Sequence, residues 1–359
     1  MRNVAIHRPG LAPGRGLPGR RLGAGAVAAG LLFFGITACS SADPSSSANS
    51  TSPSAATSAA DVNVSNVTLN IGDQAGAGAQ ALLTAAGLIN KLPFKAHWSD
   101  FTSGPPMLQA MGSGSVDIGE VGDAPPVFEA SAGGQIAVVT ALDTDPDGAA
   151  LLVPDNSPIK TVAQLKGKTV AVSQGSSANY HLLAVLTKAG LTIKDITPDY
   201  LQPAEAEAAF ASGHVDAWDI WSPYLEYAEA KYHARVLVNG SAIGDTYSFV
   251  VASRSALDNP SKAAAIRDYL KLLDQAYTWV SSHQSAWATT WAKATGMPES
   301  VMAQAVKDDI DTPRPITPAV LSSEQSVANA FSSAGLIPSK INFSDYAVTT
   351  FNSILGGSS

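Results

Sequence analysis

The chain has 359 residues, with 22 Lys and Arg against 30 Asp and Glu and a formal net charge of −8. That length exceeds what one hydrophobic core usually serves, so two packed units are expected. The acidic balance argues against nucleic acid as a partner.

The first 38 residues have the pattern of a bacterial export signal. A leader with arginines but no acidic residue passes into Leu22–Gly35, which is apolar and shorter than a typical membrane-spanning helix. Small residues then precede Cys39, and this stretch resembles the lipobox of bacterial lipoproteins. We expect a signal peptide over 1–38 and a diacylated Cys39 that anchors the protein outside the cytoplasm. The pair Arg20-Arg21 leaves the Sec and twin-arginine export routes both open.

Cys39 is also the only cysteine in the chain, so no disulfide can form within it. Once Cys39 is lipidated, no cysteine remains as a nucleophile. Residues 39–61 are rich in Ser, Ala, Thr and Pro, a composition that predicts a flexible tether. The folded part is expected to begin near Val62.

Two stretches of the folded part, 111–126 and 211–224, follow the same plan. In each, a helix-like run ends at Gly and a Val-Asp pair opens a short apolar strand. A polar residue then precedes Pro at the start of another helix-like run. The match extends upstream to expected strands at 67–71 and 169–172. Such a duplication predicts two α/β lobes with a cleft between them.

The lobe boundaries are expected where apolar strands leave each lobe. Residues 148–154 and 247–253 are such strands, and we expect them to pair as a two-strand hinge. Lobe 1 then comprises 62–149 plus 250–359, and lobe 2 comprises 150–249. Each lobe is expected to be a mixed sheet flanked by helices.

Helical periodicity dominates from Pro260 onward, with separate helices expected over 261–280 and 285–295. Trp279, Trp287 and Trp291 are expected to pack these helices against one another.

Polar residues stand where the predicted strands pass into helices. Backbone N–H groups and the helix dipole at such starts can bind a compact anion without a buried arginine. Aromatic faces nearby can cover an alkyl tail. Because Trp218 and Trp221 are three residues apart at a strand end, only one of them is expected in the cleft. The residues at these positions are Gln74, Ser103, Asp123, Ser176, Ser177 and Ser222, with Trp218, Trp221 and Tyr224 nearby.

Signals of catalysis and of cofactor binding are absent from the sequence. No G-x-S-x-G elbow occurs, and the spacing of the histidines does not match metal ligands. The glycines between 72 and 78 do not follow the G-x-G-x-x-G pattern of dinucleotide sites. We therefore expect no cofactor, no metal and no enzymatic activity.

Four motifs resemble the aliphatic sulfonate-binding proteins of ABC importers, within the nitrate, sulfonate and taurine group. They are Gly122-Asp123-Ala124-Pro125-Pro126, Gly175-Ser176-Ser177-Ala178-Asn179-Tyr180, Asp216-Ala217-Trp218-Asp219-Ile220-Trp221-Ser222-Pro223-Tyr224 and Ile316-Thr317-Pro318. The resemblance covers Val67 to about Ile354.

The resemblance implies a two-lobed periplasmic-binding-protein fold of type II. It further implies a monomer that closes on an alkanesulfonate in the interlobe cleft and delivers it to the permease and ATPase subunits of the importer. The expected ligand-binding residues are Gln74, Ser103, Gly104, Asp123, Ser176, Ser177, Ala178, Trp218, Asp219, Trp221 and Tyr247.

Other ligands stay open at this point. Taurine would need carboxylates near its amine, for which Asp123 and Asp219 are available. A thiamine-precursor pyrimidine would favour stacking on Trp218 or Trp221, and nitrate belongs to the same group of receptors. The fold also resembles aromatic sulfinate desulfinases. Those enzymes use a cysteine nucleophile, and the only cysteine here is in the leader.

Overall fold

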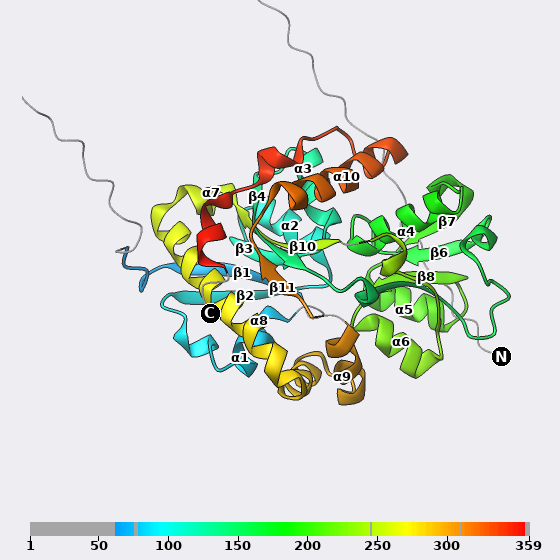
Figure 1. The fold of residues 1–359 in the computed structure, drawn as a ribbon, viewed down its shortest axis with the longest axis horizontal. Helices are drawn as coiled ribbons and strands as arrows, with labels where there is room; N and C mark the ends of the chain where they lie inside the picture. Colours follow the sequence, from blue (N-terminus) through cyan, green and yellow to red (C-terminus); the bar gives the residue numbers. More distant parts are fainter. Residues whose placement is uncertain (1–61, 75–77, 245, 309, 356–359) are drawn as a thin grey trace, which may run out of the picture. The chain divides into compact units, whose positions relative to one another are not determined.

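The computed structural model describes residues 62–74, 78–244, 246–308 and 310–355, all within the unit Thr57–Ser359 (Figure 1). The predicted signal peptide, the tether and Cys39 lie outside these ranges. Among the described helices, none combines the length and the apolar character that crossing a membrane requires.

The first sheet has six strands in the order β11-β4-β10-β3-β1-β2. Strand β1 pairs in parallel with β2 and β3, and β10 is antiparallel to both β3 and β4. The strands are β1 Thr68–Gln74, β2 Lys95–Phe101, β3 Ile118–Val121, β4 Ile136–Asp143, β10 Tyr247–Ser253 and β11 Thr312–Arg314.

The second sheet has five strands in the order β7-β6-β8-β5-β9. Strand β6 is parallel to β7 and β8, and β5 is antiparallel to β8 and β9. The strands are β5 Ala149–Val153, β6 Thr169–Val172, β7 Thr197–Tyr200, β8 Ala217–Trp221 and β9 Arg235–Asn239.

The predicted duplication is confirmed by these orders, because β2-β1-β3 in one sheet corresponds to β7-β6-β8 in the other. Helices link the strands of each repeat in the same sequence. They are α1 Ala79–Ala85, α2 Gly104–Gly112 and α3 Ala124–Ser131 in the first repeat, and α4 Ser177–Lys188, α5 Pro203–Ala211 and α6 Tyr224–Tyr232 in the second. Both sheets are mixed and flanked by helices, as predicted.

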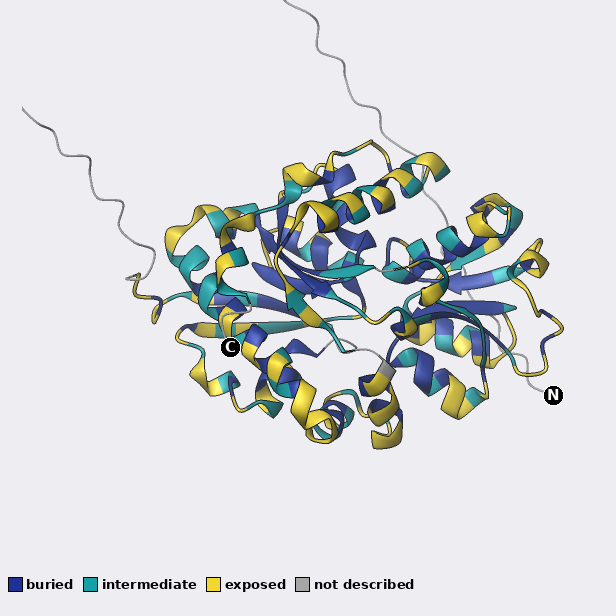
Figure 2. Ribbon diagram, in the orientation of Figure 1, coloured by how far each residue is buried: buried dark blue, intermediate teal, exposed yellow. Residues whose placement is uncertain are grey.

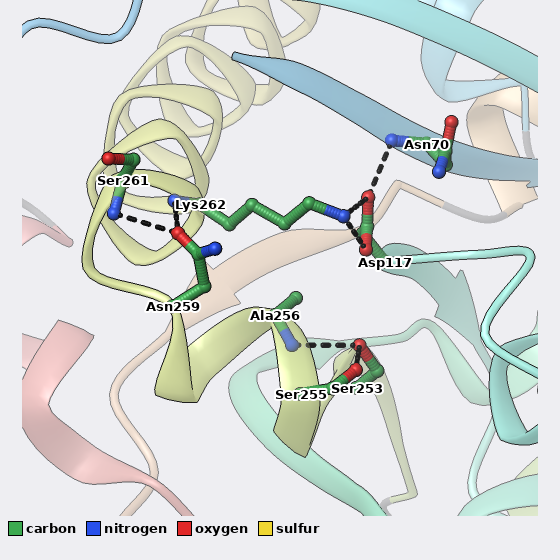
Figure 3. A network of polar contacts seen from close by, with 8 residues as sticks. All are labelled: Asn70, Asp117, Ser253, Ser255, Ala256, Asn259, Ser261 and Lys262. Atoms are coloured by element: carbon green, nitrogen blue, oxygen red, sulfur yellow. Dashed lines mark hydrogen bonds and ion pairs between the residues drawn. The ribbon is translucent and has the colours of Figure 1, made fainter.

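The aspartate of the first Val-Asp pair ties β3 to β1. Asp117 Oδ2 accepts a hydrogen bond from the Asn70 N–H at 2.9 Å, and the Asp117 N–H donates to the Asn70 carbonyl at 2.7 Å. Lys262 Nζ donates to both carboxylate oxygens, at 2.7 and 2.9 Å (Figure 3). One buried carboxylate therefore fixes two strands and the helix that carries Lys262.

The second Val-Asp pair makes the same tie. Asp216 Oδ2 accepts from the Thr169 N–H at 2.9 Å, and the Asp216 N–H donates to the Thr169 carbonyl at 2.8 Å. Here the cation is Lys168, 3.4 Å from Asp216 Oδ1, and the pair is exposed. The repeated motif in the sequence thus corresponds to a repeated contact.

The C-terminal part of the described chain is mainly helical. The longer elements are α7 Arg254–Asp258, α8 Pro260–Thr295, α9 Glu299–Asp308 and α10 Pro318–Ala334. Helix α8 runs through the two helices expected from the sequence, with a kink where His283 has non-helical backbone angles. It ends at Gly296, whose φ of 72° is in the left-handed region that glycine adopts readily. Short 3₁₀ turns complete the described chain: η1 Ile89–Lys91, η2 Pro146–Gly148, η3 Val162–Leu165, η4 Ile193–Asp195, η5 Gly240–Ala242, η6 Phe343–Tyr346 and η7 Thr349–Ile354.

The inner strands of each sheet are buried on both faces (Figure 2). In β4, Val139 packs with the cluster formed by α1, α7, α8 and α9, whereas Val138 packs with α2, α3 and α10 on the opposite face. In β6, Val170 packs with α4, and Ala171 faces α5 and α6. The alternation follows from the two-residue period of a strand.

The expected pairing of 148–154 with 247–253 is wrong, because β5 and β10 lie in the middle of different sheets. Both strands are apolar on both faces, and such strands take central positions, so each completes its own sheet. The sheets are instead joined by the segments that follow β4 and β9. These segments touch where Thr144 Oγ1 donates to the Thr246 carbonyl at 3.2 Å.

We predict that Asp117→Ala destabilises the protein more than Asp216→Ala does. Removing Asp117 leaves a buried N–H and a partly buried ammonium without their partner, a loss of about 3 kcal/mol. The exposed Asp216 pair is worth about 1 kcal/mol or less. Urea unfolding of the two variants measures the difference, and equal losses would contradict the assigned role of Asp117.

Candidate functional site

A cavity of about 170 Å³ is lined by residues of both sheets and of the helices that follow them. Seven of the residues expected to bind ligand line it. These seven are Gln74, Gly104, Asp123, Ser176, Ser177, Trp221 and Tyr247.

The starts of α3 and α4 meet at one wall of this cavity. Asp123 caps α3, with Oδ1 accepting from the Ala124 N–H at 2.7 Å. Ser176 caps α4, with Oγ accepting from the Asn179 N–H at 3.3 Å. A Cβ atom on Gly122 would overlap with Ser177 Oγ, so only glycine allows the two helix starts to approach this closely. The start of α4 therefore presents N–H groups and a partial positive charge to the cavity, whereas at the start of α3 the Ala124 N–H is bonded to Asp123 and Pro125 and Pro126 have no N–H.

Four of the expected residues do not line the cavity. Ser103 is buried and donates to Gln202 Oε1 at 2.8 Å, while Ala178 is in the first turn of α4 and faces the core. Trp218 packs in the core against Phe210, 5.9 Å between ring centroids. Trp221, three positions further along β8, reaches the cavity. The fourth residue, Asp219, is buried behind a histidine.

That histidine, His181, lines the cavity, although the sequence alone did not predict it as a ligand-binding residue. Its Nδ1 lies 3.0 and 2.9 Å from the two carboxylate oxygens of Asp219, and both side chains are almost fully buried. Burial lowers the pKa of His181, but the Asp219 carboxylate outweighs burial, and the pKa is raised overall. No lysine or arginine is among the described residues that line the cavity.

Carboxyl groups line another wall of the cavity. Glu120 lies in β3 at the position of the repeat that Asp219 takes in β8, and it accepts a hydrogen bond from the Tyr277 hydroxyl. Burial raises the pKa of Glu120 to about 7 and that of Asp123 to about 7. Burial, together with the charge of Glu120, raises the pKa of Asp311 to about 8. Comparing the two repeats position by position would have pointed to Glu120.

Aromatic rings form the remaining wall. Trp287 and Trp291 of α8 are stacked with 5.1 Å between ring centroids and an interplanar angle of 10°. They pack in the core, as expected from the sequence, and they also line the cavity. Faces of this kind can bury the apolar part of a ligand.

We predict that the free protein loses stability as pH rises from about 5 to about 7. Glu120 and Asp123 titrate near 7 when folded and near 4 when unfolded, so in this window the folded state holds more protons. Each such carboxyl then lowers the free energy of unfolding by up to about 1.4 kcal/mol per pH unit. Urea unfolding at several pH values measures the slope, and Glu120→Gln should reduce it. Stability that rises between pH 5 and 7 would contradict the burial of these acids.

Comparison with protein families gives one match over residues 88–297. The matching model is described as an ABC transporter, phosphonate, periplasmic substrate-binding protein.

Comparison with individual proteins gives relatives named for sulfonates. A protein of Escherichia coli (strain K12), whose name describes an aliphatic sulfonates-binding protein, is 37% identical over 277 residues, covering 76% of this chain and 86% of that protein. The alkanesulfonate-binding protein SsuA from Xanthomonas axonopodis pv. citri, solved bound to MOPS, has a TM-score of 0.75 and 33% identity, covering 79% of this chain and 99% of that chain. The periplasmic aliphatic sulphonate binding protein SsuA from Escherichia coli has a TM-score of 0.70 and 37% identity, covering 78% and 91%.

Proposed function

The chain belongs to the periplasmic substrate-binding proteins of ABC transporters, and from this membership we propose that its cavity captures aliphatic sulfonates for import. The resemblance to aliphatic sulfonate-binding proteins and the periplasmic-binding-protein fold, both predicted from the sequence, are confirmed. Relatives that are 33% to 37% identical to this chain are named as binding proteins.

The observation that supports the proposal most strongly is the meeting of the α3 and α4 starts in a cavity whose described lining has no lysine or arginine. Helix N–H groups and hydroxyls stabilise a single negative charge well. A sulfonate keeps one charge at every physiological pH. A phosphonate or sulfate carries a second charge near neutrality, which the nearby carboxyls would oppose. The site therefore suits a sulfonate better than a dianion.

We place the lobes at residues 62–149 plus 250–359 and at 150–249, with the Thr144 and Thr246 segments as the hinge between them. Thr102 Oγ1 and Ser103 Oγ both donate to Gln202 Oε1 at 2.8 Å, and these bonds join the two lobes. Opening the cavity requires these bonds to break. In this proposal Ser103 acts on closure, while Gln74, Gly104, Asp123, Ser176, Ser177, Trp221 and Tyr247 contact the ligand.

Outside the cytoplasm, the protein is proposed to act as a monomer beside the permease and ATPase subunits of its importer. A diacylated Cys39 and the tether over 39–61 would keep it at the membrane while allowing it to reach the permease. Taurine, nitrate and pyrimidines are not favoured as ligands, since relatives at 37% and 33% identity are named for aliphatic sulfonates and alkanesulfonates.

We predict that n-alkanesulfonates raise the melting temperature, with an effect that grows with chain length. A ligand at about 100 times its dissociation constant adds about 2.7 kcal/mol, which shifts the midpoint by a few degrees. Thermal unfolding with alkanesulfonates, nitrate, sulfate and methylphosphonate measures it. A rise with sulfate or methylphosphonate alone, or with none of the ligands, would contradict the proposal.

The same assay on Gly122→Ala tests the site. The added methyl group overlaps with Ser177 Oγ and should weaken binding about tenfold or more, because closure must then accommodate an overpacked contact. Gly112→Ala is the matched control, since its Cβ meets only the mobile tip of Glu129 and lies outside the cavity. Equal binding by both variants would place the ligand elsewhere.

A further inference from the structure

We propose that His181 is a charged anion-binding residue of the cavity, whose Nε2–H donates to a sulfonate oxygen while Asp219 holds the ring from behind. This inference rests on the proposed function and adds one cation to a site otherwise made of N–H groups and hydroxyls. Asp219 is then a positioning residue, which acts on the ligand only through His181.

The first support is a ring nitrogen without a partner. His181 Nδ1 lies 2.9 Å from Asp219 Oδ2, whereas its Nε2 is buried and has no hydrogen-bond partner among the described residues. The side chain of His181 is 2% exposed, and the residue lines the cavity. Buried polar atoms are nearly always paired in folded proteins. The free nitrogen of a histidine that borders a cavity therefore indicates a partner supplied from inside the cavity.

The second support is the chemistry of the partner on the other nitrogen. An ionised Asp219 can only accept, so Nδ1 of His181 carries a proton. In a neutral ring Nε2 would then be an acceptor and would repel an anion, whereas in the imidazolium it is a donor. The Asp219 carboxylate favours the imidazolium, because it raises the pKa of His181 against the effect of burial. The pair thus presents a charged N–H donor.

The third support is the place of His181 on α4. It lies four residues after Ser177, so both side chains share one face of the helix, and both residues line the cavity. Helical side chains lean toward the start of their helix. The ring therefore lies beside the first turn of α4, where the N–H groups have no partner within the helix. An anion held there can accept from the backbone and from His181 together.

Three groups face His181 from the elements around it. Asp219 comes from β8, the Asn239 carbonyl from β9 and Asp123 from the start of α3, and each of them favours the protonated ring. Burial raises the pKa of Asp123 to about 7, so its carboxyl is mostly uncharged below that pH. The imidazolium is then balanced by Asp219 alone, and the site accepts a single negative charge.

Isothermal titration of the protein with butanesulfonate between pH 5 and 9 tests the inference. The sulfonate stays a monoanion throughout, so any change in affinity comes from the protein. Affinity should be highest while His181 is protonated and should fall as the pH rises through its raised pKa. Glu120 and Asp123 also ionise in this range and would weaken an anion, so the profile has to be compared with that of a variant.

His181→Gln should bind butanesulfonate at least tenfold more weakly at pH 6, and its affinity should depend less on pH than that of the unmodified protein. The acids of the cavity are the same in both proteins, so the difference between the two profiles belongs to His181. His214→Gln is the matched control, because His214 is exposed and lies outside the cavity. It should keep the affinity and the profile of the unmodified protein.

Asp219→Asn gives a second readout if His181→Gln folds poorly. Asp219 does not line the cavity, and asparagine keeps its shape but removes the charge that favours the imidazolium. We expect binding at least tenfold weaker at pH 7.5, and affinity that recovers as the pH is lowered and the ring regains its proton. A merely structural loss would be the same at every pH.

Two results would overturn the inference. If His181→Gln binds as tightly as His214→Gln, or if Asp219→Asn loses affinity equally at every pH, His181 does not hold the anion, while sulfonate capture stands. If butanesulfonate does not bind the unmodified protein at any pH, the proposed function itself fails, and the role of His181 fails with it.

Discussion

The position of the cavity depends on two aspartates, Asp117 and Asp216, each of which holds the start of one strand against its parallel neighbour. The tie fixes the register, with Ile71 opposite Ile118 in one sheet and Val170 opposite Ala217 in the other. Because the strands are parallel, their carboxyl ends then finish together. Gln74, Glu120 and Trp221 reach the cavity from these ends.

The chemistry of the cavity follows from what lies at those ends. The start of α4 gives one wall N–H donors without a basic side chain, and α3 approaches it closely. Another wall of the cavity is acidic and aromatic: Glu120 comes from β3, and Trp287 and Trp291 come from α8. A single negative charge is compatible with this arrangement at the start of α4, away from the acids, where burial raises the pKa of Glu120 to about 7 and that of Asp311 to about 8. Backbone N–H groups thus make one wall of the cavity electropositive, and carboxyl side chains make another wall acidic.

Local patterns were enough to predict the repeat, the two sheets and the helix starts, because glycine, proline and Val-Asp signals act over a few residues. The same patterns could not choose partners for the two apolar strands, since β5 and β10 each had two buried faces and more than one possible neighbour. Nor could they separate Trp218 from Trp221, because the sheet face that becomes core depends on where α5 and α6 pack. Glu120, Tyr277 and Asp311 meet only through the tertiary fold, from segments far apart in the chain.

A crystal structure of the protein with butanesulfonate tests the central claim most directly, because it shows which wall of the cavity holds the negative charge. The account predicts sulfonate oxygens within hydrogen-bonding distance of N–H groups at the start of α4, with the alkyl chain toward Trp287 and Trp291. A sulfonate bound against Glu120 and Asp311, or a ligand bound outside this cavity, would contradict it.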